Sequence, residues 1–514
     1  MLLLILASFA LAGCMGGDDD SSAGKPSGTA TATATPTPTP TATPLATTQS
    51  AVDDADVGGL RFDLMALNRV DDKDVARIRL TNEADEDISI GSNSLAGSWT
   101  EAPPGGYSDV SGFALADAES RRLYTVLRES DGDCVCTRTD TLEESFLGPG
   151  EDFTVYAVFP APPPSTTTVA VTAPIGPPFP PAEIGDGEPP ALERADELPD
   201  LAAVAADEPV VLPIKSLADS LDKSRSTAEN DREVEIRLST DVLFALNSAR
   251  LSGRARGVLQ AAAAEVKEAG AQSVRLEGHA DSSGNDAIND PLSQRRADAV
   301  ARALRPLVGA DVKFSARGYG SRRPVASNDD PAGRRRNRRV SVVYARPPET
   351  ESSETEAPAP TAEGEAASGK SIDVDGRDAT AGQHVTVELD SLKAAGRLAV
   401  LTFKATNSGD EDALLTSLLD SGVEDPYRFD RNSLYGITLV DRGARQRFFV
   451  ATVRVAGDEV CLCSDAAGAN LGVDILEPGE EGRFYASYVV GPETAAVTVE
   501  LGHDAKLGGV AIER

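Results

Sequence analysis

Alternating apolar and charged positions mark the clearest strands of the chain. Residues 273–277 read Ser-Val-Arg-Leu-Glu, which predicts a half-buried strand with its two apolar residues on one face. Residues 234–238 alternate in the same way. Between these segments, apolar residues recur at helical spacing over 251–266, and Gly270 follows as a helix-terminating residue. The pattern therefore predicts a strand, a helix and a second strand in succession.

A second helix and two more strands follow. Asp290 and Pro291 predict a helix start, because an Asp side chain can cap free N–H groups and Pro is tolerated at the first helical position. The alternation of further strands returns at 312–314 and 340–344. The helix between carries apolar residues on roughly one face, namely Leu292, Val300, Leu304 and Leu307. The order β-α-β-α-β-β predicts an α/β sandwich with both helices on one face of the sheet.

Two charged residues flank the mouth of this second helix. Asp281 lies in the expected loop after strand 273–277, and Arg296 lies about a turn and a half inside the helix. A helix N-terminus already favours anions. We expect Asp281 to bind an ammonium group and Arg296 a carboxylate, so that together they select a zwitterionic ligand. The simpler interpretation is an Asp281–Arg296 salt bridge beside an arginine run that is only a solvated face.

Several motifs in this segment occur in a familiar order. They are Gly278-His279-Ala280-Asp281, Asn289-Asp290-Pro291-Leu292-Ser293-Gln294-Arg295-Arg296-Ala297, Gly318-Tyr319-Gly320 and Asn337-Arg338-Arg339-Val340. With them, residues 233–344 resemble the OmpA-like peptidoglycan-binding domain, which also occurs in peptidoglycan-associated lipoproteins and flagellar stator proteins. The resemblance implies the α/β fold described above and a role in binding the cell wall.

The resemblance also implies roles for individual residues. In that family the matching Asp and Arg hold the diaminopimelate of the wall stem peptide, and these positions are Asp281 and Arg296 here. Asn289 is similar to the family's Asn of the following loop, Asn247 to the polar residue behind the first strand, and Arg338 to the Arg that supports the ligand carboxylate. The sequence departs from the family before the Asp, where Ala280 replaces the usual Thr and removes one hydroxyl.

The regions on either side of this segment share one plan. Residues 60–173 and 384–512 contain alternating runs separated by Gly, Asn and Pro, which predict all-β modules. Four motifs recur in the same order, pairing 77–82 with 401–407, 121–126 with 447–452, Cys134-Val135-Cys136 with Cys461-Leu462-Cys463, and 147–151 with 476–480. We interpret the regions as two copies of one β-sandwich, loosely similar to the immunoglobulin-like modules of secreted bacterial lipoproteins.

The two Cys-x-Cys motifs have three interpretations. We favour a local disulfide in each, Cys134–Cys136 and Cys461–Cys463, on a turn or bulge because an extended strand separates such residues unfavourably. A redox-active dithiol is the second interpretation. Zinc binding is the third and the least favoured, because His279, His384 and His503 all lie far along the sequence from either motif.

The beginning of the chain predicts export and anchoring. An apolar run too short to span a bilayer precedes Cys14, which predicts a signal peptide with a Leu-Ala-Gly-Cys end that resembles a bacterial lipobox. Lipidation of Cys14 would anchor the mature chain, and two or three acyl chains hold more firmly than one. An uncleaved apolar start or a free Cys14 is the alternative. The Thr/Ala/Pro tract at 29–48 predicts an extended tether. At about 3.1 Å per residue, some 40 residues of tether would reach roughly 120 Å.

These patterns divide the chain into seven segments. The expected segments are a signal peptide at 1–13, a tether at 14–56, a β-sandwich at 57–173, a Pro- and acid-rich linker at 174–230 with a short strand near 210–212, the OmpA-like domain at 231–347, an acidic linker at 348–382 and a second β-sandwich at 383–514. The predicted fold class is therefore multidomain, with a central α/β sandwich between two all-β, immunoglobulin-like sandwiches and with disordered linkers.

The charge distribution narrows the class of partner. The net charge is −33, yet residues 231–347 carry 21 Lys and Arg against 14 Asp and Glu. A basic module thus lies within an otherwise acidic chain, and the acidic flanks disfavour nucleic acid.

We expect an exported, membrane-anchored envelope lipoprotein that binds peptidoglycan without catalysis, cofactor or metal. Its membrane would be the outer membrane of a diderm, or the outer leaflet of the cytoplasmic membrane of a monoderm. The alternative is an adhesion or protein-interaction scaffold, in which the β-sandwiches bind an unknown protein and the OmpA-like domain only anchors them.

Overall fold

The computed structural model describes residues 43–50, 59–90, 95–96, 99, 108–139, 142, 146–204, 206–346, 366–376, 380–419, 434–464, 475–502 and 504–514. The expected signal peptide, Cys14, the tether before Thr43 and His503 lie outside these residues. Within the described ranges, no helix has both the length and the apolar character needed to cross a bilayer.

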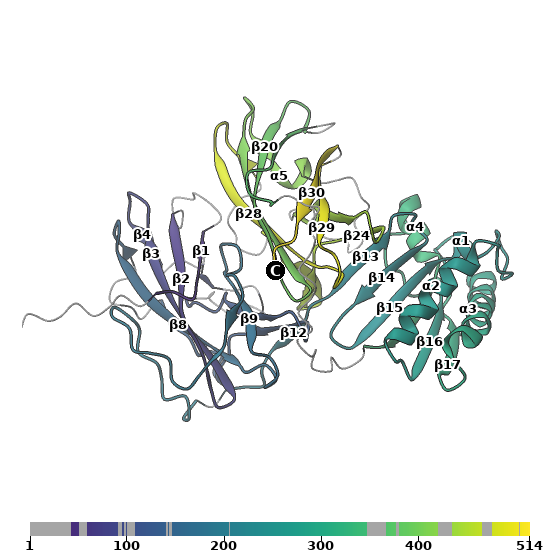
Figure 1. Cartoon of the computed structure of the whole chain (residues 1–514), viewed down its shortest axis with the longest axis horizontal. Coiled ribbons are helices and arrows are strands. Elements are labelled where there is room, and N and C mark those ends of the chain that lie inside the picture. The colour runs from purple at the N-terminus through teal and green to yellow at the C-terminus, as the bar shows by residue number, and fades with distance from the viewer. Residues whose placement is uncertain are drawn as a thin grey trace, which may run out of the picture. The chain divides into compact units, whose positions relative to one another are not determined.

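Two sheets that share one buried core form the first flanking module (Figure 1). Leu64 and Leu115, from different sheets, belong to the same apolar cluster, and the rings of Phe62 and Phe113 meet edge to face with centroids 6.1 Å apart. The first sheet has the order β1 (Ala46–Gln49), β2 (Leu60–Val70), β3 (Lys73–Asn82), β8 (Asp152–Pro160), and the second has the order β10 (Ala182–Glu183), β9 (Thr168–Thr172), β5 (Ala114–Asp117), β6 (Arg122–Thr125), β12 (Val211–Pro213).

In the described residues, the second flanking module is also all-β apart from the short helix α5 (Leu415–Leu418) and the 3-10 helix η3 (Leu434–Gly436). One sheet has the order β19 (Ser371–Asp375), β20 (His384–Ala395), β21 (Leu398–Asn407), β28 (Glu481–Val489). The other has the order β24 (Gln446–Phe448), β23 (Thr438–Asp441), β29 (Ala496–Leu501), β30 (Ala505–Ala511). Short pairs complete the two modules, namely β4 (Ile88–Ser89) with β7 (Phe146–Leu147), β22 (Ala413–Leu414) with β27 (Ile475–Leu476), and β25 (Thr452–Val455) with β26 (Asp458–Cys461).

Asn82 and Asn407 organise equivalent turns in the two modules. The side-chain amide of Asn82 donates to two backbone carbonyls at 2.7 and 2.8 Å, and that of Asn407 donates to two at 2.8 and 2.7 Å. In each turn one acceptor is a Leu far along the sequence, Leu147 or Leu476. Each Asn side chain also accepts from the N–H two residues later, at 2.8 and 2.9 Å. The two turns thus share the same pattern of side-chain hydrogen bonds.

The central module contains the elements expected from periodicity, with two additional short helices (Figure 1). In chain order they are β15 (Glu233–Ser239), α1 (Thr240–Leu243), α2 (Ala255–Glu268), β16 (Ser273–Gly278), α3 (Asp286–Val308), β17 (Lys313–Gly318), α4 (Pro331–Asn337) and β18 (Arg339–Ala345). The strand order is β17-β16-β18-β15, in which β16 and β17 are parallel and the other pairs are antiparallel.

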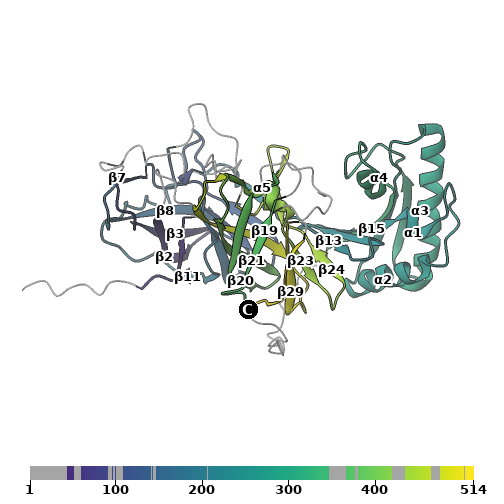
Figure 2. The ribbon, with the colours of Figure 1, turned by 90° about the horizontal axis from the view of Figure 1, so that it is seen from above.

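The helices α2 and α3 cover one face of this sheet (Figure 2). Ile236 and Leu276 from the strands and Leu259 and Leu304 from the helices belong to one buried cluster. Along β15 the alternate residues, such as Glu235, are charged, as expected for a sheet with one face outside the core. The apolar face of the sheet therefore fixes both helices in place.

Two glycines let α3 approach the parallel strands closely. A Cβ at Gly278 would lie 2.1 Å from the carbonyl oxygen of Ser293, and a Cβ at Gly318 would lie 2.3 Å from the backbone nitrogen of Gln294. Any larger residue would push the helix away from the ends of β16 and β17. This close packing holds the N-terminal half of α3 beside the loop that follows β16.

Both helix starts predicted from the sequence were wrong by about one turn. Helix α3 begins at Asp286, because the side chain of Asn285 accepts from the N–H of Ile288 at 3.1 Å and caps the helix. Pro291 is tolerated inside the helix because it removes only one early backbone hydrogen bond. Helix α2 begins at Ala255, four residues after the expected start, and Leu251 instead forms a bridge with Phe244.

Strands occupy part of the segments expected to be linkers. Between 174 and 230 lie β10, β11 (Gly185–Asp186), β12, β13 (Ser216–Ser220) and β14 (Arg225–Glu229). Strand β14 pairs with β15, and β13 pairs with both β14 and β24. Residues 46–49 of the expected tether form β1. The physical reason is that β2, β15 and β24 would otherwise be sheet edges with unpaired N–H and C=O groups, which short polar strands can satisfy.

Candidate functional site

The loop after β16 places Asp281 in a buried position. The Asp281 carboxylate is almost completely shielded from solvent, and its Oδ1 accepts a hydrogen bond of 2.9 Å from the backbone N–H of Ser283. The carbonyl of Gly320 accepts from the N–H of Ala280 at 2.8 Å, which ties the loop to the end of β17. The backbone therefore sets the direction of this carboxylate before any ligand arrives.

Arg296 extends from α3 into the same part of the module. Its Nε donates to the carbonyl of Ser248 at 3.0 Å, and its guanidinium carbon lies 5.3 Å from the centroid of the Phe244 ring. The residue is only 7% exposed. Burial lowers the pKa of Arg296 below its ordinary value, although the charges of Asp241 and Asp281 act in the opposite direction. Its two terminal nitrogens have no hydrogen-bond partner among the residues that the structure describes.

Arg338 connects two carboxylates. Its Nη1 donates to Oδ2 of Asp281 at 2.7 Å, while its Nε and Nη2 donate to the two oxygens of Asp241 at 2.9 and 2.6 Å. The hydrogen bonds to Asp241, followed by that to Asp281, raise the pKa of Arg338 above its ordinary value. Arg338 thus holds the Asp281 carboxylate in place and leaves only two of its five N–H groups for a ligand.

The two asparagines differ in their roles. Asn289 is buried in the first turn of α3, not in the preceding loop, and its amide donates back to the carbonyls of Ser283 at 3.0 Å and Asp281 at 3.4 Å. Asn247 is exposed and has a φ of 54°, and its side chain makes no hydrogen bond to the described part of the chain. Asn247 reaches the site only through its neighbour Ser248, whose carbonyl holds Arg296.

The simpler interpretation of Asp281 and Arg296 does not hold. In the described ranges Asp281 forms its ion pair with Arg338, and no ion pair joins it to Arg296. The arginine run is also not a purely solvated face, since Arg339 is 5% exposed and Arg334 donates to backbone carbonyls of its own loop. The guanidinium groups of this segment therefore have structural partners.

Sequence reasoning missed Asp241. It lies 97 residues before Arg338 and has no motif of its own. The register of β15 and β18 pairs Ser239 with Arg339, which brings the residues just beyond both strand ends to one end of the sheet. The signal that could have predicted this pair is positional. Asp241 lies two residues after the first strand, and Arg338 directly precedes the last strand.

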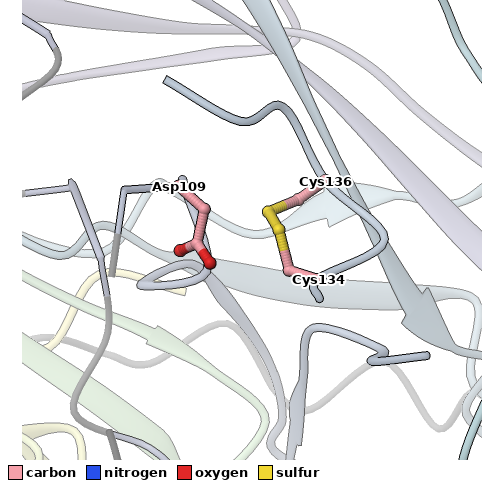
Figure 3. A group of neighbouring side chains, drawn as sticks. All are labelled: Asp109, Cys134 and Cys136. Atoms are coloured by element: carbon pink, nitrogen blue, oxygen red, sulfur yellow. A yellow bond between two sulfur atoms is a disulfide. The ribbon is translucent and has the colours of Figure 1, made fainter. Parts of the chain in front are cut away.

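The Cys-x-Cys motifs lie in the flanking modules. Disulfide bonds join Cys134 to Cys136 and Cys461 to Cys463, the pairing that the sequence analysis favoured. Asp109 approaches the first disulfide, and its carboxylate lies within 4.8 Å of both sulfur atoms (Figure 3). Because those sulfurs are bonded to each other, they are not thiolate ligands for a metal.

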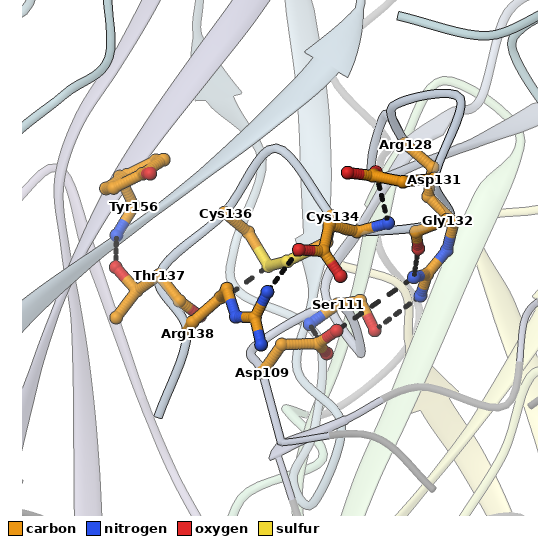
Figure 4. The surroundings of a disulfide bond; sticks show 11 residues. Asp109, Ser111, Arg128, Asp131, Gly132, Cys134, Cys136, Thr137, Arg138 and Tyr156 are labelled. Carbon is orange, nitrogen blue, oxygen red and sulfur yellow. Dashed lines mark hydrogen bonds and ion pairs between the residues drawn. A yellow bond between two sulfur atoms is a disulfide. The ribbon is translucent and has the colours of Figure 1, made fainter. Parts of the chain in front are cut away.

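Hydrogen-bonded polar side chains lie beside this disulfide, whose two cysteines also belong to the buried apolar cluster of the module (Figure 4). The side-chain carboxylate of Asp109 accepts from the N–H of Ser111 at 3.0 Å, and Arg128 donates to the Ser111 hydroxyl at 3.1 Å. The hydroxyl of Thr137 accepts from the N–H of Tyr156 at 3.0 Å, which fixes the Cys segment to β8. The disulfide therefore belongs to a hydrogen-bonded segment outside the named strands, in which Cys134 and Cys136 each form an isolated bridge.

An α/β domain with a buried Asp and a buried Arg beside the same helix defines the central module. The OmpA family model matches residues 243–338. The outer-membrane lipoprotein YfiB of Pseudomonas aeruginosa is 38% identical over 113 residues, which are 22% of this chain and 67% of that protein. The chain therefore belongs to the OmpA family through its central module.

Two further similarities concern the same module. The peptidoglycan-binding protein ArfA of Mycobacterium bovis is 38% identical over 86 residues, which are 17% of this chain and 26% of that protein. The crystal structure of the peptidoglycan-associated lipoprotein from Burkholderia pseudomallei has 33% sequence identity and a TM-score of 0.18, and covers 20% of this chain and 87% of that one.

Proposed function

We propose that this chain is a cell-envelope lipoprotein that binds peptidoglycan non-covalently through residues 231–347. Its ligand is the diaminopimelate of the stem peptide, and the binding involves no chemistry on the wall. The observation that carries the proposal is Arg296, a buried guanidinium whose two terminal nitrogens have no partner in the described residues. A carboxylate is the group whose two oxygens match that geometry.

The charge balance of the site favours a zwitterion. Asp241 and Asp281 contribute two negative charges, and Arg296 and Arg338 contribute two positive charges, so the site is neutral without ligand. An anion alone or a cation alone would leave one charge uncompensated in a largely buried place, which is unfavourable. A ligand end that carries both an ammonium and a carboxylate avoids this, and the amino acid end of diaminopimelate has that chemistry.

Asp281 has the capacity to accept the ammonium group. An ionised carboxylate offers about four lone-pair sites. Oδ1 of Asp281 uses one for the N–H of Ser283, and Oδ2 uses one for Arg338. Two sites remain for a ligand. Ala280 supplies no hydroxyl, so ligand affinity depends more strongly on Asp281 and Arg296.

Membrane attachment completes the proposed role. Lipidated Cys14 and an extended Thr/Pro-rich tether would hold the central module away from the membrane, at a distance that allows contact with the wall. The names of the relatives support this proposal, because YfiB is an outer-membrane lipoprotein and ArfA is a peptidoglycan-binding protein.

Pelleting of the full chain with purified peptidoglycan tests the proposal. Asp281→Ala and Arg296→Ala should each abolish pelleting, while Asp286→Ala should pellet like the parent. Asp286 is an exposed acid in the first turn of the same helix, so its removal changes the charge but not the proposed contacts. Retained pelleting in both site variants would refute the ligand assignment. Wall binding would then depend on residues other than Asp281 and Arg296.

A further inference from the structure

A second polar cavity adjoins the peptide site and shares Arg338 with it. Its volume is ≈ 80 Å³, and it is bordered by β13, β14, the end of α4 and β24. Its wall is strongly cationic. Among the described residues that line it, eight are Lys or Arg, four are Ser, and Asp219 is the one acid.

The counter-charges of three of these arginines lie outside the cavity wall, whereas Arg336 forms an ion pair with Asp219 of the wall itself. Arg225 forms an ion pair with Glu265, and Arg447 forms one with Glu500. Arg237 donates to Glu235 at 2.8 Å. None of these three carboxylates is among the described residues that line the cavity. Arg225, Arg237 and Arg447 are thus paired with acids outside the wall, and within the described lining Asp219 is the one carboxylate against eight cationic side chains.

Two observations at this wall point to positive charge and hydrogen-bond donors that the protein itself leaves uncompensated. The Nε of Arg447 is buried and has no hydrogen-bond partner among the described residues, which is unfavourable for a donor of this kind. Burial, with the positive charge of Arg237 acting in the same direction, lowers the pKa of Arg339 to about 10. A bound anion would relieve both effects.

We infer that this cavity binds a tetrahedral oxyanion of phosphate size. The volume has room for several water molecules, and therefore for a group of this size but not for a large ligand. Guanidinium groups and serine hydroxyls donate hydrogen bonds to phosphate oxygens in several directions at once. The oxyanion is either free phosphate or the phosphate of a lipid headgroup. Arg338 lines both this cavity and the peptide site, so the test below leaves it unchanged.

Calorimetric titration of the full chain with inorganic phosphate tests this inference. Saturable one-to-one binding is expected, with none in sodium chloride of the same ionic strength. Arg225→Gln and Arg447→Gln should each weaken binding at least tenfold. The control is Arg483→Gln, which removes the same charge from a half-exposed position of β28 outside the cavity and should bind like the parent. Circular dichroism confirms that each variant is folded.

Two results would overturn the inference. They are the absence of saturable phosphate binding by the parent, and unchanged affinity in both cavity variants. A second arm identifies the source of the oxyanion. In this arm the protein is sedimented with phosphatidylglycerol vesicles. If it sediments with them, and if free phosphate reverses this binding and Arg225→Gln weakens it, the site belongs to a lipid headgroup. Phosphate binding without vesicle binding assigns it to the free ion.

Discussion

Arg338 donates a hydrogen bond of 2.7 Å from Nη1 to Oδ2 of Asp281, the carboxylate that the sequence analysis assigned to the ligand ammonium. The same guanidinium also donates from Nε and Nη2 to the two carboxylate oxygens of Asp241. Arg338 is therefore a positioning residue for Asp281. Its orientation depends on an acid that no sequence motif identifies.

This relationship predicts coupled effects on ligand affinity. Arg338→Ala should weaken binding of a diaminopimelate-containing stem peptide about tenfold or more, because Asp281 loses its orienting partner. Asp241→Ala should weaken binding less, and Asp241→Glu should restore part of the loss. In the Asp241→Ala/Arg338→Ala double variant the effects should not add, since Asp241 acts through Arg338. Calorimetric titration of the four proteins measures the coupling. Strictly additive losses would mean that Asp241 contacts the ligand independently.

Replacing Arg296 by Lys should separate its charge from its shape. Arg296→Lys retains the charge but loses the planar fork, the Nε hydrogen bond to Ser248 and the contact with Phe244. We expect stem-peptide affinity to fall about tenfold, or about 1.4 kcal/mol, with Arg296→Ala weaker still. The same titration measures both variants. An affinity equal to that of the parent in Arg296→Lys would show that a point charge suffices and that the fork is not used.

His279 makes the central module sensitive to acid. Burial lowers the pKa of its imidazole to about 3, with the charge of Arg339 in support, from an ordinary value of 6.5. Below pH 6.5 the His279 imidazole of the unfolded chain is protonated, whereas that of the folded chain stays neutral until about pH 3. The free energy of unfolding therefore falls as the pH decreases through this window. At pH 5 the loss is about 2 kcal/mol.

Urea unfolding at pH 7 and pH 5 measures the His279 effect. The parent should lose more stability between the two pH values than His279→Gln, which has no imidazole to protonate. His384→Gln, at a half-exposed histidine, should behave like the parent. Imidazole NMR shifts should show His279 still neutral at pH 5. A protonated ring in the folded protein at that pH would contradict the prediction.

Gly278 should be intolerant of any side chain. In Gly278→Ala the new Cβ would lie 2.1 Å from the carbonyl oxygen of Ser293, so α3 must shift away from the sheet. We expect a loss of about 1–3 kcal/mol in unfolding free energy, and a weaker stem-peptide affinity because Arg296 moves with the helix. Gly257→Ala in α2 is the matched control. Its Cβ would meet nothing within 4 Å, and helix propensity predicts a gain of roughly 0.5–1 kcal/mol. Equal effects at both positions would contradict the close-packing argument.

The Cys134–Cys136 disulfide should stabilise its module only modestly. A disulfide stabilises mainly by restricting the unfolded chain, and the loop closed here is very short, so Cys134→Ser/Cys136→Ser should lose about 1–2 kcal/mol and still fold. Thermal unfolding measures this loss. Thiol alkylation of the denatured, unreduced chain should label neither residue. Rapid labelling of both in the native protein would instead favour the redox-active interpretation.

Periodicity in the sequence was sufficient to predict the four strands and two long helices of the central module. The alternation of apolar and charged residues along 234–238 and 273–277 is a local property. It arises because only one face of the sheet is buried. The placement of Asp281 in a loop and of Arg296 on a helix was predictable for the same reason, since each follows from a neighbouring strand or helix. The Cys spacing in the flanking modules likewise predicted a local bond. These features involve residues close together in the chain.

Only the tertiary structure decided which distant groups meet. Asp241 and Arg338 are separated by 97 residues, and the register of β15 with β18 brings them together. Strands β13 and β14 have little alternation of their own and form because the edge of β15 offers unpaired backbone groups. The start of α3 was set by a competition between two capping residues, Asn285 and Asp290. The contact of Asp241 with Arg338 and the formation of β13 and β14 depend on strand pairing between distant segments, and the sequence of a short segment does not contain that pairing.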